Sequence, residues 1–248
     1  MIFGLIAFGL LVGGLTGILG AGGGIIAVPA LVYIVGIPLE TAISTSLLMG
    51  AVGPIAALIP RIRTAVDWRM VGAVAIAGIP MAFIGTAVGS LLPEQVILVV
   101  FAALMFASAV QMLRRRPTEA VDDSRPPLWI LRGFAVGLLV GFLTGLLGVG
   151  GGFITVPALV LALRLPIKKA IGTSLAIAVL NSVAGIVAHV GITRPDWGVA
   201  LAFGLPAIAA SFVTARFAHR IGGRVLQTGF AVLLFVVAGL TILQVLTQ

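Results

Sequence analysis

The chain has 248 residues, of which 60% are hydrophobic and only 9% are charged, and its mean hydropathy is +1.27. A soluble domain of this length needs a far more polar surface, so the composition indicates an all-α integral membrane protein. The net charge of +8 does not indicate a nucleic-acid partner, because the basic residues lie at the ends of apolar segments, and the lack of cysteine excludes disulfides and thiolate metal sites.

The first half of the chain contains five apolar elements, which we expect to be helices because lipid offers no water to unpaired backbone groups. They cover residues 2–19, 25–35, 39–59, 70–91 and 95–113. The second of these is short enough to span only about half of the apolar thickness of a bilayer. It follows the glycine-rich segment Gly20–Gly24, where a continuous helix is unfavourable.

A polar connector then leads into a second set of five elements, at 129–147, 153–163, 168–190, 198–217 and 222–246. Residues 9–47 align without a gap to residues 137–175, and 25 of the 39 aligned positions are identical. The chain is therefore a tandem duplication. We expect one transmembrane repeat in 1–113, a cytoplasmic linker in 114–128 and a second repeat in 129–248.

The two short elements allow two counts of the membrane crossings. If each glycine-broken pair is one kinked crossing, the basic loops fall on both sides of the membrane. If each pair is re-entrant and returns to the side that it entered, only Arg194 lies apart from the other basic residues. Those residues are Arg61, Arg63, Arg69, Arg114, Arg115, Arg116, Arg125, Arg132, Arg164, Lys168, Lys169, Arg216, Arg220 and Arg224. The positive-inside rule favours the second count, which places that face in the cytoplasm and both termini outside.

With this count the chain reverses its direction across the membrane an odd number of times in each repeat. The second repeat therefore starts on the opposite side from the first, and the two halves have inverted topology. We expect the two glycine segments to enter from opposite sides and to meet near the midplane, as in inverted-repeat transporters. The first N–H groups of the helix after each segment lack partners and carry partial positive charge, so they could bind an anion. The candidate residues are Gly22, Gly23, Gly24, Gly150, Gly151 and Gly152. The alternative is that these glycines only allow close helix packing.

Hydroxyl pairs occur at matching places in the two repeats, as Thr45-Ser46 and Thr173-Ser174. They could line a cavity and donate hydrogen bonds to an oxyanion, or they could bond to a carbonyl of the preceding turn. Asn181 is the one amide deep in an apolar segment, where it could bind a ligand or hold helices together. Asp67 and Asp196 each precede a helix, and we interpret them as N-caps.

An enzyme is not expected, because the chain has only two histidines and no carboxylate deep in an apolar segment. The sequence indicates no metal site, no cofactor and no nucleotide-binding loop. Any source of energy for transport would therefore be an ion gradient.

The doubled pattern at Leu19, Gly22–Gly24, Pro29 and Leu31, repeated from Leu147 to Leu159, resembles the sulfite exporter TauE/SafE family. The resemblance covers essentially the whole chain. It implies a bacterial cell-membrane permease that moves sulfite or related sulfur-containing anions, mostly outward and with proton coupling. Ser46 and Ser174 stand where the family often has asparagine, so the resemblance does not fix the substrate.

The sequence thus predicts a multi-pass secondary transporter that exports a small sulfur-containing oxyanion, such as sulfite or an organosulfonate, by alternating access. The partners expected are the anionic substrate and membrane lipid, and proton coupling and a homodimer are compatible with the sequence. The alternatives are a permease for another small anion or a neutral solute, and a membrane scaffold that transports nothing.

Overall fold

The computed structural model describes residues 2–20, 27, 31, 36, 38–114, 128–147, 152–189 and 197–247. These residues form helices and contain no strand. The helices are α1 (Ile2–Leu19), α3 (Leu39–Leu58), η1 (Ile59–Arg61), α4 (Trp68–Gly89), α5 (Glu94–Arg114), α6 (Trp129–Leu147), α7 (Gly152–Leu161), α8 (Ile167–His189), α9 (Trp197–Phe217), η2 (Ala218–Arg220) and α10 (Gly223–Thr247). Within the described residues, six helices are long and apolar enough to cross a membrane. The predicted all-helical membrane class is confirmed.

The helix boundaries lie within two residues of those predicted, because they follow the ends of the apolar segments. Asp67 caps α4 as predicted: its Oδ1 accepts hydrogen bonds from the backbone N–H groups of Arg69 and Met70, both at 3.1 Å. The expected element at 25–35 lies mostly outside the described residues, as do Asp196 and the connector from residue 115 to residue 127. Ala27 and Leu31 are described, and both are fully buried.

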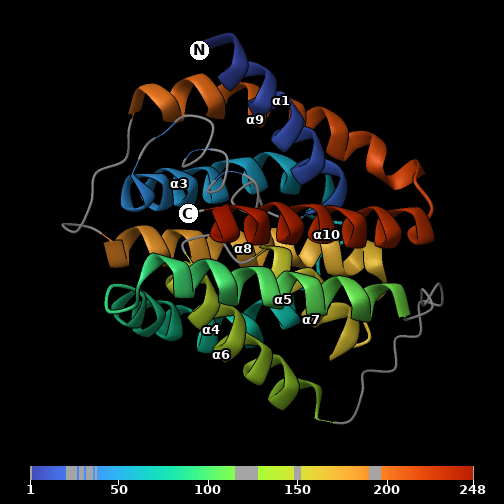
Figure 1. Ribbon diagram of the computed structural model, residues 1–248. Helices are drawn as coiled ribbons and strands as arrows, with labels where there is room; N and C mark the ends of the chain where they lie inside the picture. The colour runs from blue at the N-terminus through green and yellow to red at the C-terminus, as the bar shows by residue number, and fades with distance from the viewer. Residues whose placement is uncertain are drawn as a thin grey trace.

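Two tightly packed helix pairs form opposite edges of the bundle: α1 lies along α9, and α6 lies along α4 (Figure 1). Each pair joins the first helix of one repeat to the fourth helix of the other. Residue numbers rise together along the contacts of α1 with α9, from Gly9 beside Phe203 to Gly17 beside Ser211. They also rise together along the contacts of α6 with α4, so the helices of each pair are parallel.

Glycines make this close packing possible. A Cβ atom added at Gly13 would lie 2.1 Å from the carbonyl oxygen of Ala207, and one at Gly141 would lie 2.0 Å from that of Gly78. The two backbones therefore approach each other as closely as in other small-residue helix pairs. Gly13–Gly17 and Gly141–Gly145 are packing glycines.

Helices at equivalent places in the two repeats run antiparallel where they touch. In the α3–α8 pair, Gly185 packs against Leu47, whereas Leu175 clusters with Ala57. In the α5–α10 pair, the Gln227 amide donates to the carbonyl of Met112 at 2.6 Å. Further along the same pair, the rings of Phe106 and Phe235 make an edge contact with a centroid separation of 5.2 Å. In both pairs, successive contacts join rising residue numbers on one helix to falling residue numbers on the other, so the two helices are antiparallel (Figure 1).

Basic side chains gather at one end of this bundle, which we call the basic end. It is formed by the end of α3 with η1, the starts of α4, α6, α8 and α10, and the ends of α5 and α9. Contacts that tie these termini together include Ala65 beside Gly172, Met70 beside Gly133 and Ile167 beside Gly223. The described basic residues at this end are Arg61, Arg63, Arg69, Arg114, Arg132, Arg164, Lys168, Lys169, Arg216, Arg220 and Arg224. The start of α1 and the end of α10 lie toward the other end.

The sequence predicts that the glycine segments meet near the midplane, but apart from Gly20 and Gly152 these segments lie outside the described residues, and only the ends of α1 and α6 before them can be placed. Gly20, just after α1, packs against Ile171 at the basic end. Leu146, near the end of α6, packs against Gly89, the last residue of α4. These two contacts lie near opposite ends of α4, a helix about 33 Å long. The helix ends do not meet because α1 and α6 are full-length helices, held along most of their length by the packing glycines.

Candidate functional site

Two features of the described residues have the polarity that a solute pathway needs: a buried amide at the centre of the bundle and a cavity at the basic end. Asn181 lies on α8 between the two places where α8 touches α3, at Leu175 and Gly185. Its side chain is fully buried, and neither its Nδ2 nor its Oδ1 has a hydrogen-bond partner among the residues that the structure describes. The neighbouring Ser182 hydroxyl is also buried and has no partner within the same residues.

The environment of Asn181 is formed by small residues. Gly78 of α4 faces it, and a Cβ atom added there would lie 3.2 Å from the Asn181 Oδ1. The equivalent position in the first repeat is Gly53, so the polar group has no counterpart across the duplication. Buried polar groups are normally hydrogen-bonded, and an unpaired amide at the centre of a bundle is therefore a candidate ligand contact.

The hydroxyl pairs have protein partners where the structure describes them. The Thr173 hydroxyl accepts a hydrogen bond from the backbone N–H of Asp67 at 3.0 Å, which ties α8 to the start of α4. The Ser174 hydroxyl bonds to the carbonyl of Ile171 at 2.8 Å and lies 3.3 Å from that of Gly20. Thr45 and Ser46 are fully buried on α3. The contact of Ser174 with the Ile171 carbonyl is of the kind given by the structural alternative, a bond to the preceding turn, whereas Thr173 instead accepts from an N–H group distant in the sequence.

Most of the predicted glycine site lies outside the described residues, namely Gly22, Gly23, Gly24, Gly150 and Gly151. Gly152 is described and buried as the first residue of α7. The next residue, Phe153, packs edge-on against Phe101 of α5 with a centroid separation of 5.1 Å. The start of the short helix is thus held in the apolar core.

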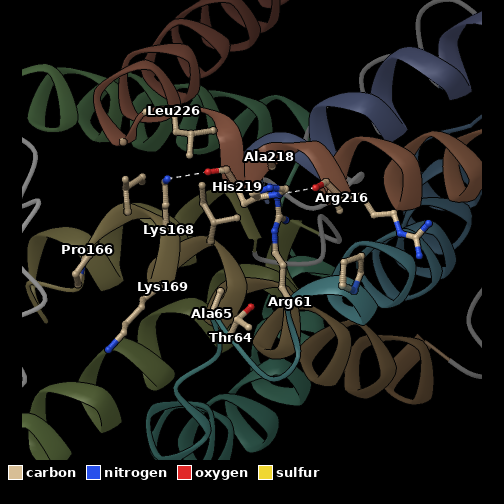
Figure 2. A pocket seen from close by; sticks show the side chains of 16 residues that line it. Arg61, Thr64, Ala65, Pro166, Lys168, Lys169, Arg216, Ala218, His219 and Leu226 are labelled. Carbon is tan, nitrogen blue, oxygen red and sulfur yellow. Dashed lines mark hydrogen bonds between the residues drawn. The ribbon is translucent and has the colours of Figure 1, made fainter.

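A cavity of about 1010 Å³ opens at the basic end, between the segment after α3, the start of α8, the end of α9 and the start of α10 (Figure 2). Its basic lining residues are Arg61, Lys168, Lys169, Arg216 and His219. No carboxylate is among the described residues that line it. A concave surface with charge of one sign concentrates counter-ions, so this cavity attracts anions.

Arg61 is the buried member of this group. Its side chain is only 8% exposed, although it lies directly after the apolar helix α3. Nη2 donates a hydrogen bond to the carbonyl of Gly17 in the last turn of α1. Nη1 is buried and has no hydrogen-bond partner among the described residues. The guanidinium is therefore charged, partly desolvated and only half satisfied.

The other basic side chains are exposed or half-buried, and their contacts hold them around the mouth. The Lys168 ammonium donates to the carbonyl of His219 at 3.0 Å, and the His219 ring lies 2.6 Å from the carbonyl of Arg216. The Arg216 guanidinium stacks over the Phe212 ring at 4.9 Å, and its charged end turns away from Arg61, as does that of Lys169 (Figure 2). Arg61 is therefore the buried member of the lining, and Lys168 and His219 lie at the mouth of the cavity.

Sequence reasoning missed Arg61 as a site residue, since it treated Arg61 and Arg63 alike as signals of topology. No pattern in the sequence separates the two. The difference arises in three dimensions, where Arg61 turns back under the end of α1 and Arg63 stays exposed.

Comparison with known proteins identifies the family. The family model described as "Sulfite exporter TauE/SafE" matches residues 5–241. The chain belongs to the TauE/SafE family. This confirms the resemblance drawn from the glycine motifs, and it makes the chain a membrane transporter, which fits the expectation that it is not an enzyme.

Several TauE/SafE relatives are known as probable membrane transporter proteins. One from Xylella fastidiosa is 35% identical over 205 residues, covering 80% of this chain and 77% of its own length. The protein YunE from Bacillus subtilis is 30% identical and covers 80% of this chain and 81% of its own length. One from Haemophilus influenzae is 29% identical over 93% of this chain and 94% of its own length. No solved structure matches the chain significantly.

Proposed function

We propose that this TauE/SafE protein is a secondary active transporter that exports a small sulfur-containing oxyanion, such as sulfite or an organosulfonate, across the bacterial cell membrane. The observation that carries the proposal is the cavity at the basic end, which is lined by basic side chains and no described carboxylate. A cation or a neutral solute would gain nothing from such a lining. The family description supplies the class of anion.

The proposed orientation places the basic end in the cytoplasm and both termini outside. Support comes from the basic residues of both repeats, which lie at the same end of the bundle in the described part of the chain. The cavity then opens to the cytoplasm, where an exporter collects its substrate.

The proposed architecture is an inverted repeat, with one half in 1–113, a linker in 114–128 and the second half in 129–248. The antiparallel contacts of α3 with α8 and of α5 with α10 support it, because a two-fold axis in the membrane plane reverses equivalent helices. Leu180 and Val52 are equivalent positions at the middle of the α3–α8 contact. Asn181 therefore lies beside the proposed axis.

Alternating access is the proposed mechanism, with the substrate passing Asn181 at the centre. In the proposed cycle, the cavity at the basic end belongs to the state open to the cytoplasm. The glycine segments follow the ends of α1 and α6, so we propose that each supplies backbone N–H donors at one mouth of the path. Thr45, Ser46, Thr173 and Ser174 would then hold the helices that move and would contact substrate only in passing.

Flux measured in proteoliposomes tests the proposed function. The purified protein should move sulfite, thiosulfate or methanesulfonate in a saturable manner, and the rate should change when the imposed proton gradient is reversed if protons are coupled. Empty liposomes and an uncharged solute of similar size are the controls. Absence of flux for all three anions under either sign of the gradient would rule out the proposal, and flux of the uncharged solute alone would favour a neutral permease.

A further inference from the structure

We infer that the Arg61 guanidinium is the centre of a specific oxyanion-binding site at the inner end of the cavity, with Lys168 and His219 at the mouth. This inference rests on the proposed function and goes beyond it, since it assigns the first binding step to one side chain. It also replaces the interpretation of Arg61 as a topology signal with a direct role in substrate binding.

The burial of Arg61 favours an anionic ligand. A charged group removed from water is costly unless it is paired and hydrogen-bonded, and removing the charge by deprotonation is not open to arginine at neutral pH. Nη2 has the Gly17 carbonyl, but Nη1 has no hydrogen-bond partner in the described part of the chain. A ligand with negatively charged oxygens would complete the set of hydrogen bonds.

The charges around Arg61 also favour an anionic ligand. Arg61 has no carboxylate partner in the part of the chain that the structure describes. Asp67, the nearest acidic residue in the sequence, caps α4 instead. Lys168 adds positive potential around the same space, and the His219 ring adds a further polar group. The missing counter-charge must therefore come from outside the protein, and the cavity is the route by which it arrives.

The geometry of guanidinium sets the class of ligand. Its N–H groups lie in a fixed plane and match two oxygens of one oxyanion, whereas lysine acts as a point charge. We therefore expect sulfite, sulfate and methanesulfonate to bind more tightly than chloride. A site formed by the mouth lysines alone would not make this distinction.

The same chemistry is presented by the phosphate of an anionic lipid headgroup, since the basic end lies at the membrane surface in the proposed orientation. The two sources can be separated by the lipid used. In nanodiscs of phosphatidylcholine every headgroup is zwitterionic and has no net charge, so binding there does not depend on an anionic lipid. We assign the site to the free anion, because the Arg61 side chain lies beneath the end of α1 and away from the exposed surface.

The test is isothermal titration calorimetry with methanesulfonate and chloride, on protein in phosphatidylcholine nanodiscs. Wild-type protein should bind methanesulfonate at least tenfold more tightly than chloride, and Arg61→Lys should lose at least tenfold in affinity for methanesulfonate. Arg63→Gln is the matched control, because Arg63 is two residues away, exposed and outside the lining. Its affinity should stay within twofold of wild type.

A second measurement keeps the inference falsifiable if Arg61→Lys does not fold. The chain has no native cysteine, so Thr64→Cys introduces a single thiol in the lining, with Arg61 intact. Methanesulfonate should slow its modification by a neutral thiol reagent at least fivefold, whereas equal chloride should not.

The outcomes distinguish a failure of the proposed binding site from a failure of the proposed transport function. Equal affinity of wild type and Arg61→Lys, or no protection of Thr64→Cys, overturns the inference even if the protein transports sulfite. Binding that appears only when phosphatidylglycerol is added assigns the site to a lipid headgroup and overturns it too. Binding that depends on Arg61 without any flux supports the site and rejects the proposed transport.

Discussion

At the scale of single residues, two groups of buried polar side chains contrast with each other. Thr16, Thr86, Thr144 and Thr241 each donate to a carbonyl one turn earlier in their own helix, at 2.7–3.0 Å. This local bonding satisfies a hydroxyl inside lipid and needs no partner from outside. Arg61, Asn181 and Ser182 instead keep buried atoms without partners among the described residues. The second group marks the proposed path.

Replacing Asn181 distinguishes a role in the substrate path from a role in stability. Asn181→Leu should change the free energy of unfolding by less than about 1 kcal/mol, because the lost amide makes no hydrogen bond and the apolar side chain is of similar size. Flux of the transported anion in proteoliposomes should fall at least tenfold. Thr144→Val is the matched control, since its hydroxyl bonds only within α6, and its flux should be unchanged. Full activity in Asn181→Leu would remove Asn181 from the path.

Sequence alone could predict part of this group. Asn181 stands out because amides are rare deep in apolar segments. Arg61 does not stand out, because its burial depends on the fold of η1 beneath α1. For Thr173 and Ser174 the sequence left a structural role open, and it could not predict their contacts with residues distant in the sequence.

At the scale of helices, apolar segment length predicts where each helix begins and ends, but not how far it reaches toward the other end of the bundle. The helices predicted at 2–19 and 129–147 are α1 and α6, and packing against α9 and α4 keeps both continuous over these lengths. The partners themselves could not be predicted from spacing. Each glycine face requires a close neighbour, and nothing local shows that the neighbour belongs to the other repeat.

This close packing makes a stability prediction. Gly141→Ala should destabilise the protein by about 1–3 kcal/mol, because its Cβ would lie 2.0 Å from the Gly78 carbonyl and force α6 away from α4. Gly72→Ala, on α4, is the matched control, since nothing lies within 4 Å of its added Cβ. It should be neutral or slightly stabilising. Denaturant unfolding in detergent measures both, and equal stability of the two variants would contradict the packing account.

At the scale of the whole molecule, the proposed inverted arrangement requires both repeats to present their basic loops to one side of the membrane. The duplication and the charge distribution predict this from the sequence. In the structure, Arg63 from the first repeat and Lys168 from the second lie at the same end of the bundle. The count with one kinked crossing per glycine-broken pair would separate these two residues by the full membrane.

Labelling of single cysteines in intact and permeabilised cells tests this most directly, because the native chain has none. Arg63→Cys and Lys168→Cys should react with a membrane-impermeant thiol reagent only after permeabilisation. Leu91→Cys, in the turn between α4 and α5 at the other end, should react in intact cells. If Arg63→Cys and Lys168→Cys react from opposite sides of the membrane, the inverted arrangement and the cytoplasmic cavity are both contradicted.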